Sequence, residues 1–334
     1  MRNLEIILFQ VDEARRYIED GRVSQLRLAL LLLDNAAEIQ MELCIQNHLL
    51  HEDWRSDFRD RIRQFHGTDL SEDLKKIIEW QPLNGKERRS VERFFDEKIR
   101  FLTERHNVLD KRLAGPLSYL HRYRNEAHHR ANVRQDTINT ACKILLDINC
   151  QMLSSVSPGV TSYSSGEDYS WLESRFGISA ARTFSRETVV KTATDDIRSR
   201  VSLSDESIAA TLAANLESRI ENVLESLDFA IENTRIPDRD AAIRESQRYG
   251  ESQRDYSLPR GVSYNNFRER HSIVYLDQLR CRLAEISKAA DKLEAFGVFS
   301  TLELEFEPVE ANIHGLAAEI DHMIQMEIDR LRGK

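Results

Sequence analysis

The chain has 334 residues, 41% of them apolar and 31% charged, with a formal net charge of −9. This balance is typical of a soluble globular protein, and the acidic charge argues against a protein that coats nucleic acid along its whole surface. Glycine and proline are few for this length, which favours helices, because a many-stranded sheet needs frequent turns. A chain this long exceeds one small core, so we expect two helical domains.

Helical spacing of apolar residues predicts a bundle in the first half of the chain. A long helix at about 23–50 is apolar on nearly every side in its middle, which indicates that it is central and buried. A second long helix is expected at 86–113, and we expect Gly115-Pro116 to end it and to open the next helix. Further helices are predicted at 4–19, 53–64, 71–80 and 135–155.

The second half is also predicted to be helical. Two apolar runs, 276–293 and 309–323, alternate by three and four residues, and we expect them to pair as an antiparallel coiled-coil hairpin. The predicted fold class is therefore all-α. Its expected parts are a helical bundle at 1–156, a linker at 157–180 rich in small and turn-forming residues, and a helical domain at 181–334 that binds a partner, senses a signal or oligomerises.

Cysteine usage and the N-terminus favour a cytoplasmic protein without a membrane partner. The first residues form an apolar patch that is too short for a secretory signal and carries an acid. The longest uninterrupted apolar stretch, 28–33, cannot span a bilayer. We interpret the cysteines as reduced, mostly buried thiols, because they form no close pair; they are Cys44, Cys142, Cys150 and Cys281.

One short motif carries chemistry. The six residues from Arg124 to His129 read Arg-Asn-Glu-Ala-His-His. They resemble the signature of HEPN domains, in which an Arg and a polar residue are followed by a His after four to six intervening positions. His129 fits that spacing, whereas His128 leaves only three intervening residues, so we prefer His129. The resemblance covers roughly 1–156, where the helical host also fits the family.

The resemblance implies a metal-independent endoribonuclease without a cofactor, of the kind found among toxins and anti-phage defence effectors. RNA is then the substrate, and an antitoxin or other regulatory protein is an expected partner. Arginine suits phosphate because its donors form a fixed fork, and histidine titrates near neutral pH. We therefore assign phosphate binding to Arg124, proton transfer to His129 and support to His128. Asn125 would orient the phosphate or the histidine, and Arg122 and Arg130 would bind RNA.

The chemistry also predicts a homodimer, or an assembly of dimers. Cleavage through the 2′-hydroxyl needs a base and an acid, yet the motif offers one well-placed histidine per chain. Two motifs facing each other across a two-fold axis would supply both groups, and HEPN proteins resemble one another in using such a composite site.

Polar residues in the apolar middle of the helix at 23–50 have two interpretations. Asp34, Asn35 and Glu38 could be buried, with an acid pairing with Arg124 and holding its fork in position. Alternatively, they form the one solvated stripe of that helix. Helical spacing places Asp34 and Glu38 on one face in either case.

Charge is unevenly spread along the chain. The segment 86–134 holds thirteen Lys and Arg against seven Asp and Glu, a balance of +6, so the remainder sums to −15. This pattern suggests focused contact with a polyanion. The segment 235–270 interleaves arginines with aromatic residues and acids, which fits either a single-stranded RNA track or a mobile loop between helices.

Two alternatives to a nuclease stay open. The chain could be a catalytically inactive HEPN-fold subunit that binds or scaffolds a defence or toxin–antitoxin complex. It could also be a coiled-coil-rich interaction protein in which Arg124 and His129 are ordinary cap and surface residues.

Overall fold

The structure, a computed structural model, describes residues 2–64, 71–129, 135–156, 170–178, 185–201, 204–254 and 270–333. Every regular element within these ranges is a helix, which confirms the all-α prediction. Contacts divide the chain into two compact units, Met1–Leu203 and Ser204–Lys334. Across the described ranges, no helix combines the length and apolar character needed to cross a membrane.

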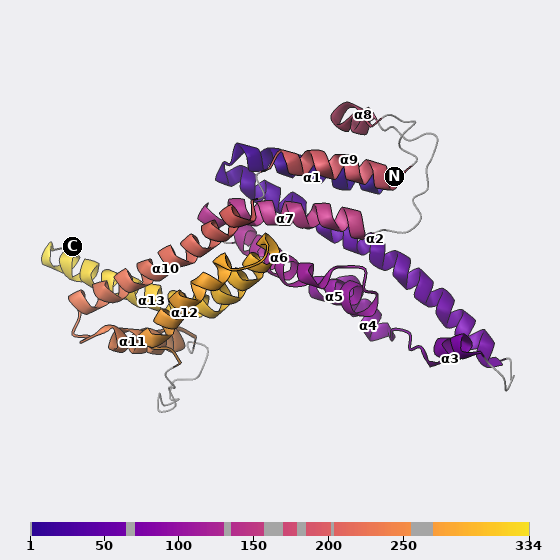
Figure 1. The fold of residues 1–334 in the computed structure, drawn as a ribbon. Coiled ribbons are helices and arrows are strands. Elements are labelled where there is room, and N and C mark those ends of the chain that lie inside the picture. Colours follow the sequence, from indigo (N-terminus) through magenta and orange to yellow (C-terminus); the bar gives the residue numbers. More distant parts are fainter. Residues whose placement is uncertain are drawn as a thin grey trace. The chain divides into compact units, whose positions relative to one another are not determined.

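Helix α2 (Val23–Gln64) is the centre of the first unit (Figure 1). It packs against α1 (Arg2–Asp20) and α7 (Gln135–Ser155), and farther along against helices of the segment 72–129. Leu30, Leu33 and Ala37 are fully buried, as the apolar middle of this helix predicts. The helix is continuous for 42 residues, so the expected break near residue 50 is absent.

The segment after α2 is broken differently from the prediction. The structure does not form one helix at 86–113. Helix α4 spans Gly85–Arg93, and the next residue, Phe94, has an extended backbone that interrupts the helix. The chain resumes as α5 (Phe95–Arg100) and a π-helical turn, η1 (Phe101–Arg105). Asn107 has a φ of 52°, a left-handed conformation that stops a helix. A short helix, α3 (Glu72–Glu79), precedes them.

The predicted break at Gly115-Pro116 is wrong. Helix α6 (Lys111–His129) begins five residues before Pro116 and passes through it. Asp110 caps its start, because its side chain accepts a 2.9 Å hydrogen bond from the backbone N–H of Arg112. Pro116 thus lies early in the helix, within its second turn.

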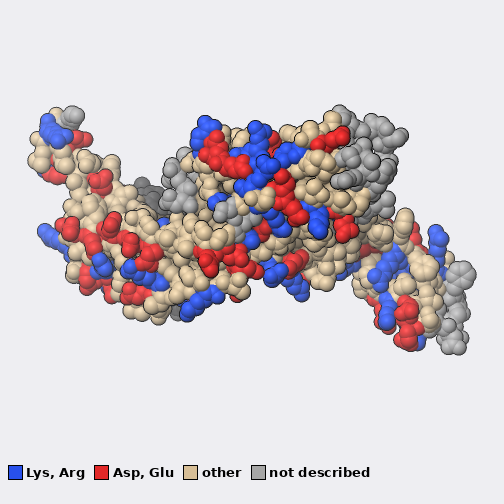
Figure 2. Space-filling view, turned by 45° about the horizontal axis from the view of Figure 1, so that its top comes forward, with Lys and Arg blue, Asp and Glu red and all other residues tan. Residues whose placement is uncertain are grey.

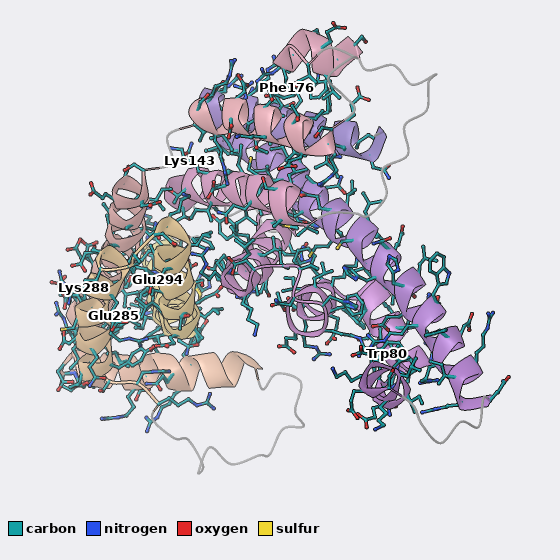
Figure 3. All side chains as sticks on the ribbon, turned by 45° about the vertical axis from the view of Figure 1, so that its right-hand side comes forward. Trp80, Lys143, Phe176, Glu285, Lys288 and Glu294 are labelled. Atoms are coloured by element: carbon teal, nitrogen blue, oxygen red, sulfur yellow. The ribbon has the colours of Figure 1, made fainter. Side chains whose placement is uncertain are left out.

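Helices that were assigned to the linker and the second domain belong to the first unit. Helix α9 (Arg186–Ser199) buries Val189, Ala193 and Ile197 and packs against α1 and α7. The preceding helix, α8 (Ser170–Phe176; Phe176 is labelled in Figure 3), reaches α1 through an edge-to-face contact of Trp171 and Phe9. The division between the units therefore falls at Leu203, beyond the expected linker at 157–180, because α9 covers apolar surface of the bundle.

The second unit contains α10 (Asp205–Asn233), α11 (Arg239–Arg254), α12 (Ile273–Ser287) and α13 (Lys292–Leu331). Helices α12 and α13 form a hairpin around the turn marked by Glu285, Lys288 and Glu294 in Figure 3. The first apolar run was expected to reach Leu293, but α12 ends at Ser287. Leu293 lies in the first turn of α13, which begins at Lys292 and is capped by Asp291. The most extensive packing of α13 is against α10 rather than α12.

Part of the segment 235–270, for which the sequence suggests either a mobile loop or a single-stranded RNA track, is helical. Arg239–Arg254 forms α11, which buries Ala242 and Ile243 and packs against α13. Its arginines include Arg248, which pairs with Glu245. The rest of the aromatic-rich segment, 255–269, lies outside the described residues. Cys44, Cys142 and Cys150 are buried free thiols, as expected, and Cys281 is exposed.

Candidate active site

The motif arginine pairs with the buried acid of the central helix. Arg124 donates from Nε to Asp34 Oδ2 at 2.7 Å, and its Nη2 donates to the same oxygen. The Asp34 side chain is 1% exposed and that of Arg124 is 23% exposed. The buried interpretation therefore holds for Asp34, and Arg124 has one fixed orientation over α2.

A histidine that the sequence analysis did not single out shares this carboxylate. His121 Nδ1 lies 2.9 Å from Asp34 Oδ1, and its ring stacks on Phe95 with the centroids 3.7 Å apart and the planes at 7°. The side chain is 22% exposed. His121 precedes Arg124 by three residues, so both lie on the same face of α6. This three-residue spacing from Arg124 is the feature of the sequence that could have indicated His121.

Asn125 also contacts the guanidinium of Arg124. Arg124 Nη1 donates to Asn125 Oδ1 at 2.7 Å. Arginine has five N–H groups, and within the described part of the chain three of them serve Asp34 and Asn125. The remaining two can donate to a phosphate oxygen. A fork held by a buried acid and a neighbouring amide loses less side-chain freedom on binding than a free one.

The other candidates in the central helix lie apart from Arg124. Glu38 accepts a 2.8 Å hydrogen bond from Lys98, whose side chain is buried. Asn35 is exposed. Of the two predicted acids, only Asp34 contacts the motif arginine.

The histidines of the motif occupy the last residues of α6. By helical geometry, position 128 follows Arg124 by one turn on the same face, and position 129 follows Asn125 in the same way. The side chains of His128 and His129 and all of Arg130 lie outside the described residues. Arg122 is exposed, with its guanidinium 5.2 Å from the centroid of the Tyr119 ring.

Much of the basic charge counted at 86–134 is paired with acids. Besides Arg124 and Lys98, Arg88 contacts Asp53, Arg100 contacts Glu97, and Arg105 contacts Glu52. On the face in Figure 2, Lys and Arg alternate with Asp and Glu rather than forming a field of one sign. Because of these ion pairs, a polyanion at residues 86–134 would meet local contacts more than a broad positive potential.

A second cluster of titratable groups lies farther along α2. The rings of His48 and His106 are 4.1 Å apart between centroids, and His106 Nε2 lies 3.2 Å from Glu52 Oε1. Burial lowers the pKa of both histidines. The nearby His48 lowers the pKa of His106 further, and His51 does the same for His48. Beside this cluster, a hollow of about 440 Å³ between α4 and η1 is lined by residues that include Phe101 and Arg105, and by none of the motif.

No protein-family model, curated protein or solved structure matches the chain. Among the residues that the structure describes, no group of three or more His, Cys, Asp and Glu side chains is placed to hold a metal ion.

Proposed function

We propose that the chain is a metal-independent endoribonuclease of the HEPN type that cleaves RNA through its own 2′-hydroxyl. The observation that supports this most is the Asp34–Arg124–Asn125 arrangement, because it holds a partly exposed guanidinium on the helix that carries the motif. A preorganised cation is what a phosphorane-like transition state needs, since its charge develops on the phosphate oxygens.

We assign the catalytic and binding roles to the residues of the motif and its neighbours. Arg124 binds the scissile phosphate, and His129 or its neighbour His128 transfers a proton. Asn125 fixes the guanidinium, and Arg122 and Arg130 contact the RNA backbone. The resemblance to HEPN proteins places such an enzyme among toxins or anti-phage defence effectors, with RNA as substrate, a second copy of the chain as partner and a regulatory protein as inhibitor.

The test is incubation of the purified chain with total RNA in the presence of a chelator. Cleavage products should end in a 2′,3′-cyclic phosphate and begin with a 5′-hydroxyl. Substituting a 2′-deoxynucleotide at a mapped cleavage position should block cleavage there. Arg124→Ala should be inactive in the same assay, which excludes a contaminating nuclease. Intact RNA at high enzyme concentration, with a correctly folded chain, would refute the proposal.

The alternative, a binding or scaffold subunit of the same fold, has its own support. The charge of Arg124 is already compensated by Asp34, and several basic residues of the segment 86–134 form ion pairs of their own. Such a protein would bind an RNA or a partner without cleaving it. Retained RNA binding with no cleavage by the wild-type chain would favour this alternative.

A further inference from the structure

RNA transesterification needs two proton-transfer groups, and the described structure contains one that the motif does not include. His121 is held by two independent contacts, the hydrogen bond of Nδ1 to Asp34 and the stack on Phe95. Because Arg124 donates to the other oxygen of Asp34, this side chain acts as a carboxylate, which accepts but does not donate. Nδ1 of His121 therefore carries a proton, and in the neutral imidazole Nε2 is the nitrogen with the free lone pair.

A histidine in this tautomer is prepared to act as a base. A buried carboxylate on one ring nitrogen fixes the orientation of the ring and stabilises the imidazolium that forms when the other nitrogen accepts a proton. Asp34 is almost fully buried, whereas the ring of His121 is partly exposed, so the acid is shielded while the histidine can meet a ligand.

The order of residues along α6 fits an in-line reaction. His121 lies one turn before Arg124, and position 128 lies one turn after it, on the same face. Positions 121 and 128, seven residues apart, are separated by about 10 Å along the helix axis. A phosphate bound at Arg124 would therefore lie between two histidine positions. In-line displacement requires that arrangement, because the attacking and leaving oxygens are on opposite sides of phosphorus.

We infer that His121 is the general base of the reaction and that Asp34 is its positioning residue; this inference rests on the proposed function. Nε2 of His121 removes the proton of the 2′-hydroxyl as the 2′-oxygen attacks phosphorus. The bond from phosphorus to the 5′-oxygen breaks, and that oxygen takes a proton from a motif histidine. The products are a 2′,3′-cyclic phosphate and a 5′-hydroxyl, and the two histidines return to their starting states by exchanging protons with water.

The first experiment compares His121→Gln with Arg124→Ala on the same RNA. His51→Gln, which changes an exposed histidine of α2, is the control. His121→Gln should lower kcat/KM by about 10²–10⁴-fold, and the acid limb of its pH profile should disappear. His121→Phe keeps the stack on Phe95 and serves as the second variant if the glutamine variant does not fold. The inference is overturned, and the proposed function kept, if both folded His121 variants cleave RNA normally while Arg124→Ala does not.

A second experiment separates base from acid. A ribonucleoside 3′-(4-nitrophenyl phosphate) has a leaving group that needs no acid but still needs removal of the 2′-hydroxyl proton. The His121 variants should stay impaired on this substrate by a similar factor. His128→Ala or His129→Ala, whichever removes the acid, should recover most of the activity lost on RNA. Full recovery by the His121 variants would show that His121 is not the base. If the wild-type chain cleaves neither RNA nor the aryl ester, the proposed function itself fails.

Discussion

Asp34 and Arg124 are 90 residues apart in the chain, yet their side chains are joined by a 2.7 Å charge-assisted hydrogen bond from Nε to Oδ2. The same carboxylate accepts from His121. One buried acid of α2 thus fixes the orientation of two side chains on α6. Asp34, His121 and Arg124 therefore interact with one another. The effects of substitutions at these three positions on the free energy of unfolding should not be additive.

Removing the motif arginine or histidine should abolish RNA cleavage while leaving the fold intact. Arg124→Ala and His129→Ala are each expected to lower the cleavage rate by about 10²–10⁴-fold, because they remove phosphate binding and proton transfer. His128→Ala should be milder if His129, which fits the motif spacing, is the proton donor. The larger loss in His128→Ala would instead assign that role to His128, whose position shares the face of Arg124. Rates on one defined RNA, with circular dichroism as the control for folding, decide this. Normal cleavage by both of the first two variants would falsify the assignment.

Asp34→Asn should destabilise the first unit strongly. It leaves Arg124 without its buried counter-charge, and breaking a buried ion pair costs about 3–5 kcal/mol in the free energy of unfolding. Because Arg124 is partly exposed, the lower end is expected. The matched control is Asp53→Asn, also in α2, where the side chains of Asp53 and its partner Arg88 are 51% and 40% exposed; its effect should stay below about 1 kcal/mol. Urea unfolding measures both, and equal effects would contradict the structural role of Asp34.

Stability should fall as the pH is lowered below about 6.5. Burial lowers the pKa of His48 and His106 in the folded chain. Below the unfolded pKa, the unfolded chain therefore binds more protons than the folded one, and the free energy of unfolding decreases with falling pH. His106→Gln should flatten this dependence, whereas His322→Gln, at an exposed position of α13, should change it less. Urea midpoints between pH 8 and pH 5.5 test this; an unchanged slope in His106→Gln would argue against it.

Fragments should reveal where the first unit ends. A fragment 1–203 keeps α9, whose Val189, Ala193 and Ile197 are buried, and it should unfold cooperatively. A fragment 1–156 leaves the apolar surface under α9 in water, so it should melt at a lower temperature and bind a hydrophobic dye. Circular dichroism melting curves of both fragments provide the comparison. Identical melting temperatures would mean that α9 adds nothing to the bundle.

Cleavage should require a homodimer if the active site is composite across a two-fold axis. Light scattering should then give twice the chain mass, and the specific activity should fall on dilution below the dissociation constant. A base at His121 gives one chain two proton-transfer groups of its own. A fully active monomer would therefore contradict the dimer while remaining consistent with His121 as the base.

The sequence by itself determined the helical class, the central position of α2 and the candidate motif. Apolar spacing along one helix is local information, and it is enough to indicate that the middle of 23–50 is central and buried. The same reasoning placed Asp34 among apolar neighbours and named Arg124 as a partner for an acid there. It failed at Gly115-Pro116, because a proline near the start of a helix is compatible with either a break or a continuing helix.

Only the tertiary structure decided which acid meets Arg124 and that His121 joins it. Asp34 and Glu38 share a face of α2, so spacing cannot distinguish them. The packing of the helices distinguishes them, because α6 brings Arg124 to Asp34 and α5 brings Lys98 to Glu38. The boundary between the units at Leu203 could not be predicted from the sequence either, since it depends on α9 packing against α1 and α7. These outcomes depend on contacts between residues far apart in sequence, where burial and electrostatic pairing are set by how the helices pack.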